Sequence, residues 1–403
     1  MVPAMDGNSL RAQRAGVNQR GIRDHNERLL LFLLLRHRAI PAAELARVTG
    51  LSKPTVSAIL RKLEDDGLVR RGDPLRGRVG KPSIPIELDP DGVLSVGLKI
   101  GRRSADLLLL DIAGVVRGQL HTTYDYPLPD AVFGFLKSGL ATLLGSLPKG
   151  LQSRVCGIGI GSPFELWKWH DLVGIAAERF RSWKDIDFRS EVLAFSDLPV
   201  YVVNDATGAC HAEHLYGRGS AFRDYAYFFI GSFVGGGVVL NGTVFEGNQG
   251  NAGALGSMRT TGPLGEGQQL IDTASLNLLE ARLVEAGIDP QALWQMPQDW
   301  SGLSRYVEPW IGATAQELAK ASLSICSVFD FGAILIDGAF PPEVRHELVA
   351  RTRRYMINQD HRGLIVPKIE AGDIGENARG IGAASVPIFS QFLLNTNAGL
   401  DGV

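Results

Sequence analysis

The side chains that could recognise DNA stand close together near the amino terminus. The candidate contacts are Ser52, Lys53, Thr55, Ser57, Ala58 and Arg61. Ammonium and guanidinium groups suit phosphate oxygens and guanine edges, hydroxyl groups suit phosphates and bases, and an exposed methyl group suits the methyl of thymine. This combination predicts a surface that enters the major groove of double-stranded DNA.

Two short helices joined by a tight turn are expected to present these side chains. Pro41 stands where the first helix would begin, Gly50 supplies a left-handed exit from it, and Ser52 can cap the second helix. The apolar residues of the second helix recur at the spacing of one buried stripe, namely Val56, Ile59, Leu60 and Leu63. The alternative is an ordinary helical hairpin with a solvated polar face.

The residues that follow predict a two-stranded wing. Segments 67–71 and 83–88 have the composition of strands, and a basic, glycine-rich tip, 76–82, lies between them. Arg78 and Lys81 in this tip suit the narrow minor groove, whose negative potential attracts cations. A helix-turn-helix followed by such a wing predicts a winged helix-turn-helix domain.

We expect this domain to occupy residues 23–90. An apolar helix over 29–37, capped by Asp24 or Asn26, would pack on the helix-turn-helix. Residues 1–22 are polar and are expected to form a flexible arm.

The charge of the chain is divided unevenly between its two parts. The 403 residues have a formal net charge of −2, but residues 1–88 hold 16 Lys and Arg against 9 Asp and Glu. A basic head on an acidic body predicts that the head alone meets nucleic acid. Three cysteines far apart in sequence indicate neither a zinc knuckle nor a disulfide framework, and no leader or membrane span is evident, so we expect a cytoplasmic protein.

Strands and helices alternate beyond the head, which predicts an α/β body. The expected strands are 93–100, 106–111, 115–121, 154–160, 200–203, 224–230, 235–240, 333–337 and 364–369. The expected helices are 130–147, 207–216, 274–286, 314–328, 343–358 and 377–392. Two lobes would result: a small one from 91–203 plus 377–403, and a large one from 204–376 with the dimerisation and effector elements.

Several glycine-rich motifs appear in a fixed order along the body. They are Gly157-Ile158-Gly159-Ile160-Gly161-Ser162-Pro163, Val203-Asn204-Asp205-Ala206, segments 231–237 and 247–258, Ala333–Gly338 and Gly380–Ala384. In this order the chain resembles the ROK family of bacterial sugar kinases and sugar-responsive repressors. The head, with Leu51–Ser57 and Gly77–Pro82, is similar to the repressor branch. The resemblance implies a two-lobed actin-like ATPase body, a sugar-like effector, and a dimer or a dimer of dimers.

Departures from the family pattern predict that kinase activity and metal binding are lost. Lys99 stands where the resemblance implies a metal-handling aspartate, and Arg102 and Arg103 replace small residues of the phosphate loop. A cation cannot bind Mg²⁺, so we expect no phosphoryl transfer and no cofactor. The alternative is that the two arginines bind phosphate in a new way. Ser257 replaces the family's zinc histidine and segment 262–269 lacks cysteine, so we expect no metal site.

The effector contacts that the resemblance implies are partly kept. Asn204 and Asp205 are present, whereas Ala254 replaces a glutamate that contacts the sugar. Asp205 would be the base of a kinase; here it either binds the effector or caps the helix that follows. Glu178 and Arg179, in a loop that borders the sugar, could supply replacement contacts or be surface charges.

These observations together predict a DNA-binding transcriptional regulator, expected to be a repressor of carbohydrate-related genes, with an inactive sugar-kinase-like effector domain. A symmetric dimer would read a palindromic operator. Two alternatives stay open: an active ATP-dependent sugar kinase with an accessory DNA-binding head, and a regulator that has lost its effector.

Overall fold

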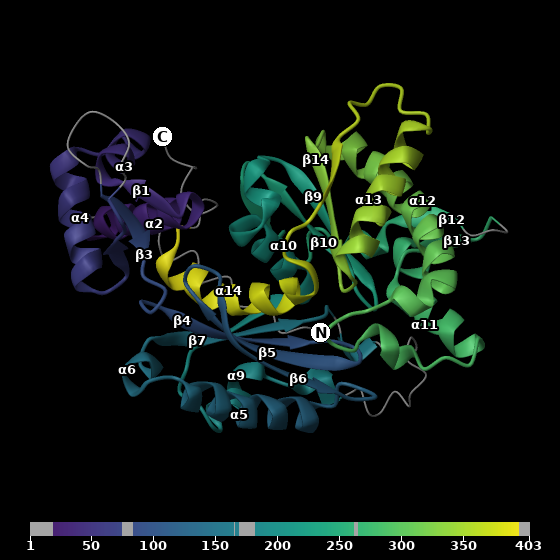
Figure 1. The fold of residues 1–403 in the computed structure, drawn as a ribbon, viewed down its shortest axis with the longest axis horizontal. Coiled ribbons are helices and arrows are strands. Elements are labelled where there is room, and N and C mark those ends of the chain that lie inside the picture. The colour runs from purple at the N-terminus through teal and green to yellow at the C-terminus, as the bar shows by residue number, and fades with distance from the viewer. Residues whose placement is uncertain (1–18, 75–83, 165, 169–181, 262–264, 395–403) are drawn as a thin grey trace. The chain divides into compact units, whose positions relative to one another are not determined.

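The computed structural model describes residues 19–74, 84–164, 166–168, 182–261 and 265–394. These residues form two compact units (Figure 1). The first contains the described residues up to Asp89 together with Gln391–Leu394, and the second contains Pro90–Ser390. No described helix is long and apolar enough to cross a membrane.

The first unit has the expected helix-turn-helix. Helix α3 (Ala42–Thr49) ends at Gly50, whose φ of 70° is the left-handed conformation that glycine adopts without strain. Helix α4 (Lys53–Asp65) begins after Ser52, whose side chain accepts a hydrogen bond from the Thr55 N–H. The stripe of Val56, Ile59, Leu60 and Leu63 is buried, so these predictions are confirmed.

Three short strands complete this unit in the order β1-β3-β2. Strands β2 (Val69–Arg71) and β3 (Pro85–Leu88) form the two sides of the wing. Strand β1 (Ala39–Pro41), which the sequence analysis did not predict, pairs antiparallel with β3. The wing tip lies outside the described residues.

Helix α2 is longer than expected. It spans Gln19–His37, so it begins inside the segment 1–22 that was predicted to be an arm. The sequence of its first turns is mostly polar and has no proline, and a single glycine, Gly21, is not enough to end a helix that packing stabilises. The buried residues of its second half are Leu30, Leu31, Leu34 and Leu35.

The second unit contains two five-stranded sheets. The first has the order β6-β5-β4-β7-β8. Its strands are β4 (Leu94–Ile100), β5 (Ser104–Asp111), β6 (Val116–Thr123), β7 (Val155–Ser162) and β8 (Val200–Asn204). Strands β4, β7 and β8 are parallel, so their carboxyl ends meet at one edge of the sheet.

The second sheet has the order β11-β10-β9-β14-β15. Its strands are β9 (Tyr225–Ile230), β10 (Val234–Leu240), β11 (Thr243–Phe245), β14 (Ala333–Gly338) and β15 (Lys368–Ala371). Helix α10 (Asp205–Tyr216) packs on one side of this sheet, and helices α12 (Ser304–Phe329) and α13 (Pro342–Ile357) pack on the other (Figure 1). Helix α11 (Leu276–Glu285) adjoins α12. Strands β12 (Arg259–Thr261) and β13 (Gly267–Gln269) pair antiparallel as a separate two-stranded sheet, and Thr260 donates a hydrogen bond to Glu317 of α12.

Helix α14 (Ala378–Phe392) lies on one face of the first sheet, and helix α5 (Pro129–Ser146) covers the other (Figure 1). Helix α14 lies very close to β7, because a Cβ added to Gly159 of β7 would lie 1.8 Å from the carbonyl oxygen of Ala383 in α14. Gln391 and Phe392, the last two residues of α14, belong to the first compact unit, although the sequence analysis assigned them to the small lobe.

Candidate functional site

The DNA-reading candidates of the head lie on one exposed face of α4. Lys53, Thr55, Ser57, Ala58 and Arg61 are all exposed, opposite the buried stripe of the same helix. Ser52 is exposed too, but its hydroxyl is held by the Thr55 backbone N–H at 3.2 Å and the Thr55 hydroxyl at 2.8 Å. An exposed face of cations, hydroxyls and a methyl group is able to enter a major groove.

Other basic residues of the head have structural partners. Lys62 Nζ lies 2.7 Å from Glu27 and joins α4 to α2, and Arg71 Nε donates to Glu64 at 2.9 Å. Among the described residues, Lys53 and Arg61 have no ion-pair partner, so their charges stay available for phosphate. Arg78 and Lys81 lie outside the described residues.

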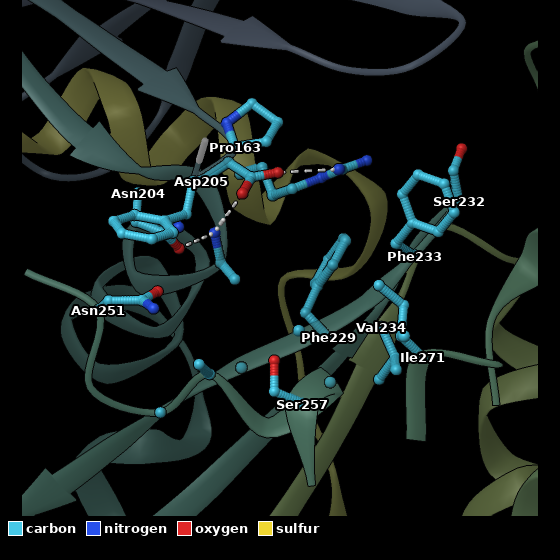
Figure 2. A pocket seen from close by; sticks show the side chains of 18 of the residues that line it. Pro163, Asn204, Asp205, Phe229, Ser232, Phe233, Val234, Asn251, Ser257 and Ile271 are labelled. Atoms are coloured by element: carbon cyan, nitrogen blue, oxygen red, sulfur yellow. Dashed lines mark hydrogen bonds and ion pairs between the residues drawn. The ribbon is translucent and has the colours of Figure 1, made fainter. Parts of the chain in front are cut away.

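A pocket in the second unit lies where the parallel strands of the first sheet end. Arg102 follows β4, Pro163 follows β7, and Asn204 and Asp205 follow β8. The turn between β9 and β10 and the loop 251–257 close the other side (Figure 2). Parallel strands place side chains from distant parts of a chain at one edge in this way. Figure 2 shows Asn204 and Asp205 facing Phe229 across this space.

Asn204 and Asp205 have different roles at the start of α10. Asn204 Oδ1 accepts hydrogen bonds from the N–H groups of Ala206 and Thr207, both at 3.1 Å, so Asn204 is the helix cap. Asp205 is the first residue of the helix, and its Oδ2 accepts a hydrogen bond from Arg379 Nη1 at 3.1 Å. Asn204 thus holds the cap position that was considered for Asp205, while Asp205 Oδ1 accepts one further hydrogen bond from the Ala206 N–H at 2.9 Å.

Lys99 is held away from the pocket. Its Nζ lies 3.0 Å from Ser104 Oγ and 2.9 Å from Asp106 Oδ2, in the row of directly paired residues Lys99, Asp106 and His121 on β4, β5 and β6. Burial lowers the pKa of Lys99, although Asp106 opposes this. Burial alone would raise the pKa of Asp106, but Lys99 and His121 together hold it below its ordinary value.

Arg102, by contrast, lines the pocket. Its Nη2 forms an ion pair with Glu280 Oε2 on α11, and both side chains are about nine-tenths buried. Glu280 Oε1 also accepts a hydrogen bond from Trp294 Nε1 at 2.9 Å. Burial and the neighbouring charge of Arg103 lower the pKa of Arg102 to about 10, so it is a cation at neutral pH.

Sequence reasoning missed several pocket residues, above all Arg379. The sequence feature that could have identified Arg379 is a single cation in the first turn of a largely apolar helix. It stands directly before the Gly380–Ala384 motif. Ser232, Asn251 and Phe229 also line the pocket, together with Ala254 and Ser257 at the two substituted family positions. Glu178 and Arg179 lie outside the described residues, so their role stays a prediction.

Comparisons with known proteins agree with this architecture. Residues 95–269 match the ROK family model, and residues 23–70 match the model described as winged helix-turn-helix DNA-binding. The body of the chain is therefore similar to the ROK family, and the winged helix-turn-helix head supports a DNA-binding regulator.

Two relatives illustrate the similarity in sequence. The chain is 26% identical to the uncharacterized protein y4fQ of Sinorhizobium fredii over 91% of each chain. It is 24% identical to the xylose repressor of Bacillus subtilis, over 60% of this chain and 62% of the repressor.

Two solved structures share the fold. A ROK family transcriptional regulator that is a homologue of the Escherichia coli MLC protein superposes with a TM-score of 0.63, at 19% identity, over 91% of this chain and 98% of that one. A ROK family glucokinase from Streptomyces griseus, in complex with glucose and AMPPNP, has a TM-score of 0.56 at 21% identity, over 73% of this chain and 98% of the glucokinase. At these identities the likeness shows the fold alone.

Proposed function

We propose that this chain represses carbohydrate-related genes, that its body senses a small sugar-like molecule, and that the body has no kinase activity. The observation that supports a regulator most strongly is the exposed polar face of α4 in a winged helix-turn-helix head. The similarity to a protein named xylose repressor favours repression and a carbohydrate effector. A protein that binds chromosomal DNA in this way would act in the cytoplasm.

Two ion pairs argue against kinase activity in the body. A kinase base must draw the proton from the attacking hydroxyl, but the carboxylate of Asp205 is held by Arg379. A metal-binding aspartate is also needed beside the phosphates, but Lys99 stands at that position and is paired with Asp106. The kinase alternative keeps some support, because a glucokinase shares the fold of the body.

The proposed mechanism is a population shift. A ligand in the pocket would favour one arrangement of the body, and the change would alter how two heads of a dimer fit DNA. Two heads related by a two-fold axis would read a palindrome whose half-sites lie about one or two helical turns apart. The third reading, a regulator without an effector, predicts no ligand at all.

The decisive experiment measures DNA binding by the full chain. Fluorescence anisotropy would be recorded with fragments from upstream of its own gene and with a scrambled fragment, in about 150 mM salt. We expect one upstream fragment to bind at least about 1,000-fold more tightly than the scrambled one. Equal, weak binding to both fragments would contradict the proposal.

A second measurement separates the alternatives for the body. Incubation with Mg-ATP and a panel of hexoses and amino sugars should give no sugar phosphate. Sustained turnover would favour the kinase reading instead. A thermal-shift screen would test sugars, sugar acids and polyols. If none of them raises the melting temperature of the protein, the effector-independent regulator is favoured.

A further inference from the structure

The pocket of the body is small, and two arginine side chains are among those that line it. Its volume is about 310 Å³, at the lower end of the range for ligand pockets, which suits one monosaccharide-sized molecule. Two arginines, Arg102 and Arg379, are among its described lining residues, against one carboxylate, that of Asp205. A site built for an uncharged sugar does not need two guanidinium groups.

Arg379 is only partly satisfied by its protein partner. Its Nη1 donates to Asp205, while its buried Nε has no hydrogen-bond partner among the described residues. Its guanidinium carbon lies 5.0 Å from the centre of the Phe229 ring, which holds the planar group by a cation–π contact. A guanidinium has five N–H donors, so one carboxylate contact leaves capacity for another acceptor.

Arg102 repeats this arrangement from another element. Its Nη2 pairs with Glu280, its buried Nε likewise has no hydrogen-bond partner in the described part of the chain, and its guanidinium carbon lies 5.9 Å from the Phe233 ring centre. Burying a charged group is expensive unless its donors are satisfied. Two arginines with an unused buried N–H, both lining one pocket, point to an acceptor that the protein itself does not supply.

We infer that the ligand of this pocket is an anionic sugar derivative whose oxyanion, a carboxylate or a phosphate, binds Arg102 and Arg379. Guanidinium groups match the oxygens of such anions with charge-assisted hydrogen bonds. The amide of Asn204 and the hydroxyls of Ser232 and Ser257, which also line the pocket, are suited to the hydroxyl groups of the same molecule. This inference rests on the proposed effector role of the pocket.

Anion binding would also act on the pair of Arg102 with Glu280. This pair joins the turn after β4, in the first sheet, to α11, which packs beside the second sheet. An oxyanion competes with Glu280 for the guanidinium, so binding would weaken a buried link between the two halves of the body. A ligand that weakens this link binds the two arrangements of the body with different affinities, as a population shift requires.

The test compares matched ligands on the full-length protein. Isothermal titration calorimetry would use glucose, glucuronate, gluconate, glucose 6-phosphate and inorganic phosphate. We expect at least one of the three sugar anions to bind 10-fold or more tightly than both glucose and inorganic phosphate. Comparing glucuronate and gluconate with glucose 6-phosphate shows whether the pocket prefers a carboxylate or a phosphate. Glucose binding as tightly as its anionic derivatives, or no binding by any sugar anion, would overturn the inference.

Variants test the assignment to the two arginines. Arg379→Met and Arg102→Met should each reduce the affinity for the sugar anion about 10- to 100-fold, the value of a charge-assisted hydrogen bond. Asp205→Asn frees Arg379 from its partner, so it should maintain or increase the preference for the anion over glucose. Arg362→Met, at an exposed arginine paired with Asp360, is the matched control and should leave the preference unchanged.

The ratio of anion to glucose affinity is measured within one variant, so it separates a binding role from a loss of folded protein. An unchanged ratio in both arginine variants would assign the arginines to structural ion pairs and overturn the inference. Binding to the upstream DNA fragment is measured separately. Failure there with intact anion binding would contradict the proposed function and leave this inference standing.

Discussion

Arg379 and Asp205, which are 174 residues apart in sequence, form an ion pair of 3.1 Å between Nη1 and Oδ2 in the wall of the body pocket. Each side chain is about nine-tenths buried. The pair neutralises the carboxylate that follows β8 and joins the first turn of α14 to the first turn of α10. It therefore bears on both the stability of the body and the chemistry of its pocket.

Removing one member of this pair should destabilise the body strongly. Arg379→Met leaves the Asp205 carboxylate buried without a cation, for which we expect a loss of about 3–5 kcal/mol in the free energy of unfolding. The double variant Asp205→Asn with Arg379→Met has no unpaired charge and should lose much less. Urea denaturation measures both values. A double variant that is no more stable than the single one would show that the pair does not carry this energy.

The close packing of α14 on β7 gives a second prediction. In Gly159→Ala the new methyl group would meet the Ala383 carbonyl oxygen, which belongs to the backbone and cannot easily move. We expect a loss of about 1–3 kcal/mol or more. Gly145→Ala is the control, because Gly145 is an exposed residue of α5 whose added Cβ meets nothing within 4 Å. That change should stabilise the protein by about 0.5–1 kcal/mol. Equal effects of the two changes would contradict the described packing.

The pair of Lys99 with Asp106 predicts an acid-sensitive contribution to stability. The pKa of Asp106 is below its ordinary value in the folded protein. The ionised carboxylate is therefore more stable in the folded protein than in the unfolded chain. This contribution is fully present above the unfolded pKa of about 4 and is lost as the pH falls through the lower folded value.

Asp106→Asn should therefore be less stable than the original protein at pH 7 and lose less stability on acidification. Urea denaturation between pH 7 and pH 3 measures this difference. Asp360→Asn, at an exposed ion pair, should change stability little at pH 7. Parallel acid curves for Asp106→Asn and the original protein would contradict the assignment.

Arg61 should contribute directly to DNA affinity. Arg61→Ala removes an exposed cation from the polar face of α4, and we expect a loss of about 1–3 kcal/mol in binding to the operator. If the contact is to phosphate, the slope of log affinity against log salt should also decrease by about 1. Arg362→Ala, an exposed arginine of the body, serves as the control. Unchanged affinity and slope in Arg61→Ala would exclude this face as the reader.

The elements of the fold could largely be predicted because their signals are local. Gly50, Ser52 and the apolar stripe of α4 each specify structure within a few residues of themselves. Strand β1 could not be predicted, since its three residues form a strand through pairing with β3, far along the chain. The early start of α2 was missed for a similar reason, because tertiary packing of its second half stabilises a polar first half.

The site was predictable only in part. Asn204 and Asp205 were found by resemblance, but their division of roles depends on backbone geometry at the start of α10. The pairs of Asp205 with Arg379 and of Arg102 with Glu280 join residues that are distant in sequence, and single-chain spacing carries no signal for such contacts.

Ligand-dependent release of DNA tests the central claim that the pocket controls the head. The full chain, bound to its upstream fragment in about 150 mM salt, would be titrated with the sugar anion that calorimetry identifies while anisotropy is recorded. We predict that the ligand changes operator affinity about 5- to 150-fold, and that Arg102→Met and Arg379→Met require much higher ligand concentrations for the same change. An operator affinity that the bound ligand leaves unaltered, or a response that both pocket variants retain in full, would contradict the account.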